Sequence, residues 1–319
     1  MDEKQIQKLV ENSGAEMTET HISWILLDDY AYKIKKPVKF SFLDFTTLEK
    51  RKHFCEEEVR LNRRLSPGMY LGVAGITNGE EISLEGSGNP LDYAVKMKRM
   101  PKNRTMDMLL AQDEITKQHI EEIAGIVAKF HKNIQVISGK KYGSPEVVKS
   151  QIDDLAGFRS VVQQSAGLGT RVDFIVEKSD EFIRERKGSF EKRQREGHIR
   201  DCHGDLHSAN IFITDKISIF DCIEFNPEFR YIDTASEIAF MSMDLDAFGK
   251  GDFSEFFVRR YLDITKDEGM REMLGLYKCY RANVRAKIAA IDYTQHPGPE
   301  PRERMEKYLG LAEEYAEKL

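Results

Sequence analysis

The sequence has neither of the glycine-rich phosphate-binding motifs that are easiest to recognise. No Gly-x-x-x-x-Gly-Lys-Ser/Thr occurs among its 319 residues, which excludes a conventional P-loop site. No Gly-x-Gly-x-x-Gly precedes the lysine-rich segment over residues 33–39. If the chain binds a nucleotide, the phosphates must be held by other groups.

Cysteine and long apolar runs are also scarce. The four cysteines lie far apart without a Cys-x-x-Cys pair, so we expect buried thiols rather than a zinc cluster or a disulfide framework. The chain begins with polar residues, and no uninterrupted apolar run is long enough to span a bilayer. We therefore expect a soluble, cytoplasmic protein with no membrane partner.

An excess of positive charge is missing as well. There are 54 acidic and 48 basic residues, a net charge of -6. Proteins that follow nucleic-acid phosphates usually carry a strong basic excess, so no nucleic-acid partner is expected. The length is sufficient for two lobes, each with its own core.

The most informative segment runs from Asp205 to Asp221. Four residues separate Asp205 from Asn210, and Asp221 ends a later apolar run. Short apolar segments over 211–213 and 217–220 predict a hairpin that would bring Asn210 and Asp221 to the same end. This set suits phosphoryl transfer, in which one carboxylate orients the attacking hydroxyl while an amide and a second carboxylate hold magnesium ions.

The run His203-Gly204-Asp205-Leu206-His207-Ser208-Ala209-Asn210-Ile211 resembles the catalytic loop of the aminoglycoside phosphotransferase and choline kinase group. These are small-molecule kinases with the protein-kinase fold. The resemblance implies an α+β, bilobal fold with a small β-rich N-lobe and a larger, mainly helical C-lobe, which we place at residues 1–100 and 101–319. It also implies ATP and Mg²⁺ as cofactors, Asp205 as the catalytic base, and Asn210 and Asp221 as metal ligands.

The same resemblance requires a phosphate-binding lysine paired with a glutamate. In the strand predicted over residues 30–36, alternation places Lys33 and Lys35 on one face. A kinase pairs such a lysine with the nucleotide phosphates and with a glutamate on the next helix. We predict Lys33 with Glu58; Lys35 and Glu57 are the alternatives, and a solvated charged face is the other interpretation of both charge runs.

Two further segments are predicted to contact the nucleotide. The loop that replaces the glycine motif offers the hydroxyls of Thr20 and Ser23, together with backbone N–H groups, to the phosphates. Later in the chain, Met97 would lie against adenine. Backbone groups near Lys98 to Met100 would form hydrogen bonds to the base.

Hydrophobic periodicity and turn residues predict the remaining elements coarsely. Strands are expected over 19–27 and 30–36, and residues 92–101 are expected to form a last strand that runs into a connector. Helices are expected over 48–65, 107–110, 115–131, 277–290 and 302–318. Further helices are expected within 141–200, with an interruption at 165–169.

Several charged residues outside the motif have competing interpretations. Asp233 is expected to cap a helix, and His131 to have a packing role at a buried helix end. Glu224 either contacts acceptor hydroxyls or is simply solvated. Arg281 and Arg285 could clamp an anionic group on the acceptor, although pairing with surface acids is the preferred interpretation.

These observations predict an ATP- and Mg²⁺-dependent O-phosphotransferase, a kinase whose acceptor is a hydroxyl of a small metabolite. A protein Ser/Thr kinase is the first alternative, disfavoured by His203-Gly204-Asp205 and by the lack of an Ala-Pro-Glu segment. A catalytically inactive nucleotide-binding module is the second. An aminoglycoside-modifying role ranks lower, because no acidic cluster suited to a polycation is evident. The acceptor, the choice of ATP over GTP and the oligomeric state are left open.

Overall fold

The computed structural model describes residues 1–79, 81–139 and 141–319, and the chain divides into two compact units. The first unit contains Met1–Leu109 together with Ala209–Pro227, and the second contains Leu110–Ser208 and Glu228–Leu319. Residues 209–227, which follow the predicted catalytic aspartate, therefore pack with the amino-terminal part. The functional division at residue 100 stays a prediction.

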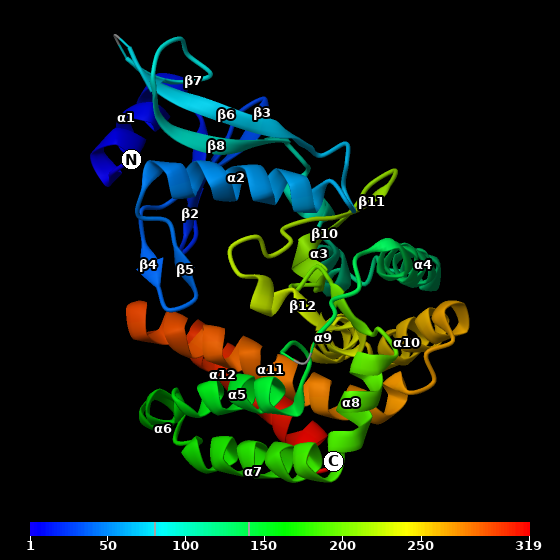
Figure 1. Cartoon of the computed structure of the whole chain (residues 1–319). Coiled ribbons are helices and arrows are strands. Elements are labelled where there is room, and N and C mark those ends of the chain that lie inside the picture. Colours follow the sequence, from blue (N-terminus) through cyan, green and yellow to red (C-terminus); the bar gives the residue numbers. More distant parts are fainter. Residues whose placement is uncertain (80, 140) are drawn as a thin grey trace. The chain divides into compact units, whose positions relative to one another are not determined.

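A six-stranded antiparallel sheet forms the centre of the first unit (Figure 1). Its strand order is β1-β2-β3-β8-β6-β7. The strands are β1 (Glu16–Glu19), β2 (Ser23–Leu27), β3 (Tyr30–Lys35), β6 (Tyr70–Asn78), β7 (Ile82–Leu84) and β8 (Pro90–Lys98).

Helices α1 (Glu3–Ser13) and α2 (Leu48–Asn62) of this unit belong to separate apolar clusters. Ile34 of β3 shares a cluster with α1, whereas Ala31 of the same strand shares one with α2. Because strand side chains alternate between faces, Lys33 and Lys35 lie on the α2 face. Figure 1 shows α2 running along β8 on that side.

Two short hairpins complete the first unit. One joins β4 (Lys39–Phe40) to β5 (Leu43–Asp44), and the other joins β10 (Ile211–Ile213) to β11 (Ile217–Ile219). The second hairpin is the one that the apolar segments predicted. Single 3₁₀ turns cover Lys102–Arg104, Ser208–Asn210 and Pro227–Phe229.

The second unit is mainly helical. A two-stranded ribbon joins β9 (Ile199–Asp201) to β12 (Tyr231–Asp233), and α3 (Met106–Ala111) spans the division between the units. The remaining helices are α4 (Lys117–Asn133), α5 (Pro145–Ala156), α6 (Arg159–Ala166), α7 (Gly169–Glu185), α8 (Lys187–Arg195), α9 (Thr234–Ala247), α10 (Gly251–Thr265), α11 (Met270–Gln295) and α12 (Pro299–Ala316).

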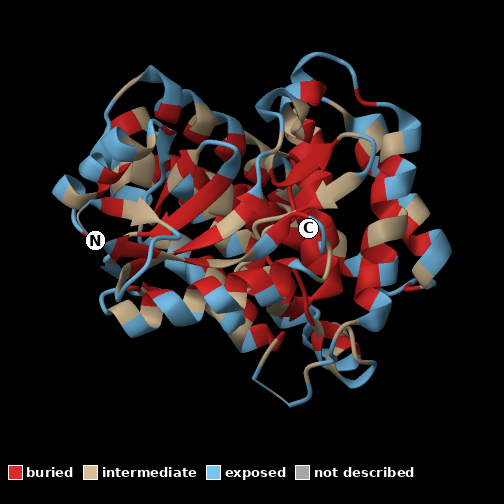
Figure 2. Ribbon diagram, turned by 90° about the horizontal axis from the view of Figure 1, so that it is seen from above, coloured by how far each residue is buried: buried red, intermediate tan, exposed pale blue. Residues whose placement is uncertain are grey.

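Helix α9 is the most buried element of the second unit. Every residue from Thr234 to Leu245 is buried, while the outer helices carry exposed residues along one side (Figure 2). A helix that is buried along nearly its whole length is a core helix. The polar side chains that α9 does carry therefore lie inside the protein and need partners there.

Two expectations from composition can be compared with the structure. Cys55, Cys202, Cys222 and Cys279 are all buried thiols. Within residues 1–79, 81–139 and 141–319, no helix has both the length and the apolar character needed to cross a membrane.

Candidate functional site

The β10–β11 hairpin brings Asn210 and Asp221 to its open end. The Phe220 N–H donates to the Asn210 carbonyl at 3.0 Å, one step beyond the last paired residues of the hairpin. Asp221 has a φ of 62°, in the left-handed region, and its N–H donates to the Tyr70 hydroxyl. This backbone bend turns the chain out of the strand at Asp221.

Lys33 meets two carboxylates on the α2 face of the sheet. Its Nζ lies 2.5 Å from Asp221 Oδ1 and 3.0 Å from Glu58 Oε1. The Lys33 side chain is 11% exposed and that of Asp221 is 40% exposed, so this end of the group is accessible to a ligand. The structure thus joins the predicted lysine, glutamate and metal-ligating aspartate within one unit.

Lys35 contacts the same glutamate from the other side. Its Nζ donates to Glu58 Oε2 at 2.7 Å and also to Glu224 Oε1, and all three side chains are almost completely buried. Glu58 therefore pairs with both candidate lysines rather than one. The solvated interpretation of Glu224 was wrong, because this carboxylate is buried and pairs with buried Lys35. Its contact with acceptor hydroxyls stays a prediction.

The mutual attraction of these groups fixes their protonation states. Burial alone would lower the pKa of Lys33, but Asp221, Glu58 and Glu224 raise it well above its usual value. Lys35 behaves in the same way because of Glu224 and Glu58. Burial opposes ionisation of Glu58, yet the two lysines lower its pKa to about 2. Both lysines and Glu58 are therefore charged at neutral pH.

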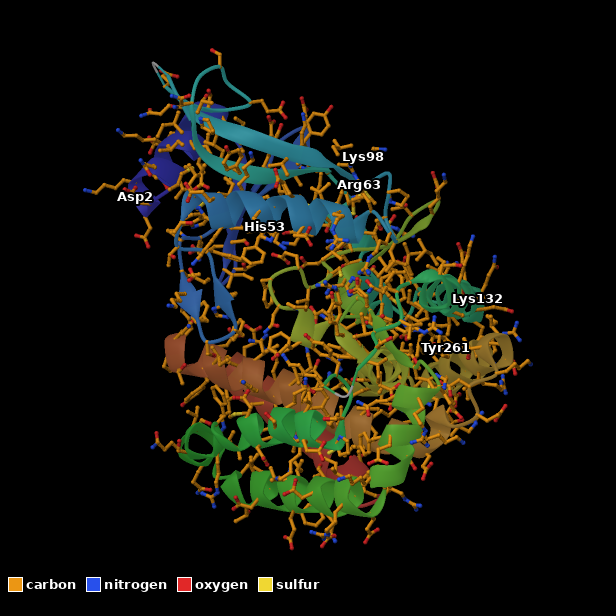
Figure 3. The ribbon with its side chains drawn as sticks, viewed as in Figure 1. Asp2, His53, Arg63, Lys98, Lys132 and Tyr261 are labelled. Carbon is orange, nitrogen blue, oxygen red and sulfur yellow. The ribbon has the colours of Figure 1, made fainter. Side chains whose placement is uncertain are left out.

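The predicted adenine-contacting residues lie in the first unit. Met97 and the partly buried Met100 belong to an apolar cluster with Ala31 and Val95, which also includes the stacked rings of Phe212 and Phe220. Lys98 is exposed at the end of β8, where its N–H donates to Met69 O (Figure 3). Their contact with adenine stays a prediction.

The Thr20 hydroxyl closes the loop between β1 and β2. Thr20 Oγ1 accepts from the Ser23 N–H at 3.0 Å and donates to the Ser23 carbonyl at 3.2 Å. Ser23 is completely buried, and its hydroxyl has no hydrogen-bond partner within the described part of the chain. The geometry gives Thr20 a role in shaping this loop, and phosphate binding by either hydroxyl remains a prediction.

The first part of the catalytic-loop motif, from His203 to Ser208, lies in the second unit, where it is bonded to α9. Glu237 accepts hydrogen bonds from the His203 N–H at 3.0 Å and the Gly204 N–H at 2.6 Å. Asp244, two turns further along α9, accepts from the Ser208 N–H at 2.8 Å. Two buried carboxylates thus bind the backbone on both sides of Asp205.

The carboxylate of Asp205 is partly exposed, at 34%, and His207 Nε2 lies 3.4 Å from its Oδ2. Burial acts to raise the pKa of Asp205, but attraction to His207, Arg285 and His203 outweighs it and holds the pKa below its usual range. Asp205 is therefore ionised at neutral pH, which is the state that its predicted role as a base requires.

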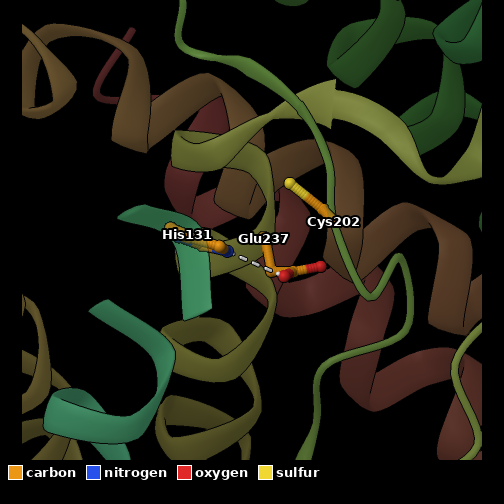
Figure 4. Close-up of side chains that lie close together, drawn as sticks. All are labelled: His131, Cys202 and Glu237. Atoms are coloured by element: carbon orange, nitrogen blue, oxygen red, sulfur yellow. Dashed lines mark hydrogen bonds and ion pairs between the residues drawn. The ribbon is translucent and has the colours of Figure 1, made fainter. Parts of the chain in front are cut away.

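His131, Cys202 and Glu237 form a compact buried group whose ligand-type atoms lie within 4.8 Å of one another (Figure 4). Hydrogen bonds explain this proximity: His131 Nε2 pairs with Glu237 Oε1 at 2.8 Å, and His131 Nδ1 with the Tyr261 hydroxyl at 2.7 Å. Glu237 also accepts hydrogen bonds from the His203 and Gly204 N–H groups, so this buried group holds the loop in place. The packing role expected for His131 is confirmed.

Two other charged residues of this unit can now be placed. Asp233 caps α9 as expected, since its side chain accepts from the Ala235 N–H at 2.8 Å. Arg281 is buried and donates to the Gly204 carbonyl at 3.1 Å and to Ser236. The preferred interpretation of Arg281 as a surface partner was wrong, because its guanidinium supports the catalytic loop.

Sequence relatives occur in mycobacteria. Uncharacterized proteins of Mycobacterium bovis and Mycobacterium tuberculosis are 31% identical to the chain over 288 residues, a match that covers 88% of this chain and 55% of each relative. The chain thus spans about half the length of the curated relatives it matches. No family model matches it.

Solved structures give a more distant likeness over almost the whole chain. A choline kinase of Cryptosporidium parvum has a TM-score of 0.60 at 10% identity, covering 96% of this chain and 89% of that one. A Plasmodium vivax ethanolamine kinase has a TM-score of 0.53 at 13% identity, with coverages of 94% and 82%. An aminoglycoside phosphotransferase in a ternary complex with AMP-PNP and hygromycin B has a TM-score of 0.55 at 11% identity, with coverages of 98% and 97%.

At such low identity these likenesses concern the fold, and they agree with the β-rich first unit and the mainly helical second unit described above. The α+β class expected from the motif is confirmed. This chain has the protein-kinase-like fold shared by choline kinases, ethanolamine kinases and aminoglycoside phosphotransferases.

Proposed function

We propose that this chain is an ATP- and Mg²⁺-dependent O-phosphotransferase that phosphorylates a hydroxyl of a small metabolite. The observation that carries the proposal is the meeting of Lys33, Glu58 and Asp221 on one face of the sheet. The likeness in fold to a choline kinase and an ethanolamine kinase, both of which are small-molecule kinases, supports the same proposal. Residues 1–100 would bind the nucleotide, and residues 101–319 would supply the catalytic loop and the acceptor site.

In this proposal Lys33 contacts the nucleotide phosphates while Glu58 holds its ammonium group in place. The buried ion pair fixes the position of Nζ, so less rotamer freedom is lost when a phosphate binds. The apolar cluster with Met97 and Met100 offers a surface for the base. The β1–β2 loop, shaped by Thr20, supplies backbone N–H groups for the phosphates.

Asn210 and Asp221 suit magnesium in their chemistry. Mg²⁺ prefers oxygen ligands, and the hairpin offers an amide and a partly exposed carboxylate at the same end. Bound there, the ion would neutralise charge on the nucleotide phosphates. Lys33, now paired with Asp221, would then be available to the phosphates.

Asp205 would accept the proton of the acceptor hydroxyl. Its lowered pKa keeps it ionised, and the loop that carries it is held by Glu237 and Asp244. Phosphoryl transfer depends mainly on positioning and charge stabilisation, so a fixed carboxylate that orients the hydroxyl is the principal requirement.

The direct test is transfer of labelled phosphate from ATP to pools of hydroxylated metabolites in the presence of Mg²⁺. We expect label in a small molecule, and Asp205→Asn should lower kcat by about 10²- to 10⁴-fold while nucleotide affinity stays nearly unchanged. Asp215→Asn, an exposed change in the turn between β10 and β11, is the matched control and should keep full activity.

Three outcomes would contradict the proposal. Label found in polypeptide rather than metabolite would favour the protein-kinase alternative. Nucleotide binding without transfer to any pool would favour the inactive module. Equal activity of Asp205→Asn and the wild type would remove Asp205 from its role.

The acceptor can be sought separately by thermal shift. A ligand that binds only the folded protein raises the unfolding temperature by mass action. Metabolites should therefore be screened with Mg²⁺ and AMP-PNP present, and a compound that stabilises only under those conditions should also receive label in the transfer assay.

A further inference from the structure

Five side chains of the first unit alternate in charge in a single row, here called the charge ladder: Asp221, Lys33, Glu58, Lys35 and Glu224. Lys33 contacts Asp221 and Glu58, and Lys35 contacts Glu58 and Glu224. The phosphate-binding scheme proposed above uses only the first three members. Lys35 and Glu224 form a second, buried layer, and the scheme assigns no role to these two residues.

Glu58 is shared unequally between the two lysines. Lys35 donates a hydrogen bond to Oε2 at 2.7 Å, whereas Lys33 lies 3.0 Å from Oε1 as an ion pair. Among the described residues, no hydrogen bond of good geometry reaches Oε1. The shorter contact of Glu58 is thus with Lys35, so a shift of the carboxylate further toward Lys35 would lengthen its contact with Lys33.

Glu224 affects how Glu58 is shared between the two lysines, because Glu224 is the second anion beside Lys35. Lys35 is completely buried, and its Nζ also lies 4.9 Å from the centre of the Phe45 ring. Without Glu224, buried Lys35 would keep Glu58 as its remaining carboxylate partner among the described residues. Glu58 also faces Lys33, whose other partner is Asp221. A buried charge that has lost one partner is strongly destabilised, and it moves toward any remaining opposite charge.

We propose that Glu224 is a positioning residue for Lys33: by neutralising Lys35, it leaves Glu58 Oε1 facing the Lys33 ammonium group. Glu224 acts through two intervening side chains and does not itself contact the nucleotide. The consequence for phosphate binding rests on the proposed function, whereas the effect on the Lys33–Glu58 distance does not.

The first test is the structure of Glu224→Gln. We expect Glu58 to turn both oxygens toward Lys35, so that the separation of Lys33 Nζ and Glu58 Oε1 exceeds the ion-pair limit of about 4 Å. An unchanged separation overturns the inference, whether or not the protein binds a nucleotide.

The second test measures the dissociation constant of Mg²⁺–AMP-PNP. Glu224→Gln should weaken binding by about 10- to 100-fold, because a shift of the Lys33 ammonium group by about 1 Å would misplace its contact with the phosphates. The double variant Lys35→Met/Glu224→Gln removes the whole second layer, and it should recover most of the lost affinity. No recovery would mean that Glu224 acts independently of Lys35, which overturns the inference.

A control separates positioning from lost stability. Ile76→Ala opens a cavity in the core on the α1 face of the sheet, away from the charge ladder. It should lower the unfolding temperature while leaving the affinity of the folded protein unchanged. If Ile76→Ala weakens binding as much as Glu224→Gln does, the role of Glu224 is only structural.

A wild-type chain that binds no nucleotide refutes the proposed function alone, since the structural test of Glu224→Gln still decides the inference.

Discussion

Arg193 shows how much one buried side chain contributes to the second unit. Its guanidinium donates to Asp233 at 2.6 and 2.7 Å and to Asp267 at 2.9 Å, and all three residues are buried. Asp233 is also the cap of α9, the helix that holds the catalytic loop. The arginine therefore joins α8 to the start of that helix.

Replacing Arg193 by methionine should destabilise the protein by about 3–5 kcal/mol, because two buried carboxylates lose their counter-charge. Urea unfolding monitored by circular dichroism measures the loss. The control is Arg159→Met, since the Arg159 pair with Asp173 is about half exposed, and solvent screening leaves such a pair with little effect on stability. Equal losses of unfolding free energy for the two variants would show that the buried Arg193 network stabilises the protein no more than an exposed ion pair does.

Glu237 should make stability depend on pH in the acid range. Burial opposes its ionisation, but His131, His203 and the Gly204 N–H lower its pKa to about 2. A carboxyl with a lowered folded pKa stabilises the protein above the unfolded pKa, near 4.5, and this contribution disappears as pH falls toward 2. The shift corresponds to a contribution on the order of 3 kcal/mol.

Urea unfolding of the wild type and Glu237→Gln between pH 2.5 and 6 tests this expectation. The variant should be less stable at pH 6, since an amide can accept only one of the two loop N–H bonds. Its stability should also fall less steeply below pH 4.5. Parallel curves for the two proteins would assign the acid sensitivity to other groups.

At the scale of single elements, the sequence was most informative where local patterns decide the structure. Period-two alternation placed Lys33 and Lys35 on one face, and the turn at 214–216 located the β10–β11 hairpin correctly. The interruption expected at 165–169 is also present, because Gly167 ends α6 in the left-handed conformation. Each of these features is set by neighbours along the chain.

Features that depend on distant residues were missed. Glu224 lies three positions after Asp221, and nothing local distinguishes a partner of buried Lys35 from a solvated acid. Helix α1 was not anticipated either, although it has local signals: Asp2 and Gln5 form a capping box at its start, and Gly14 ends it in the left-handed conformation. Glu237 had a usable signal, since it directly precedes the apolar run Ile238 to Met241, and an acid beside such a run that becomes buried must be paired in the core.

The end of the β10–β11 hairpin allows backbone and carboxylate effects to be separated at Asp221. Asn tolerates the left-handed conformation well, whereas Ala adds a strain of about 1 kcal/mol. Both substitutions remove the carboxylate facing Lys33. Asp221→Asn and Asp221→Ala should therefore lose Mg²⁺-dependent nucleotide binding alike, while thermal unfolding should show the Ala variant to be the less stable. Mg²⁺-dependent binding retained by Asp221→Asn would exclude Asp221 as a necessary ligand.

At the scale of the whole molecule, the division between the two units falls within the catalytic-loop motif. Asp205 belongs to the second unit, and Asn210 and Asp221 belong to the first. The proposed base and the proposed metal ligands therefore have different supports: α9 holds Asp205, while the sheet and α2 hold the groups that would meet the nucleotide. Substitutions in the first unit should then affect nucleotide binding, and substitutions in α9 should affect the position of Asp205.

Amide hydrogen exchange can test this separation directly. Mg²⁺–AMP-PNP should slow exchange in peptides from β3, α2 and residues 209–227, because a ligand stabilises the local structure that it contacts. Peptides from α5 and α7, which belong to the other unit, should exchange at the same rate with and without the nucleotide. Lys33→Met at the same nucleotide concentration should abolish the protection. Slowing confined to α5 and α7 would place the nucleotide in the second unit and refute the role assigned to Lys33.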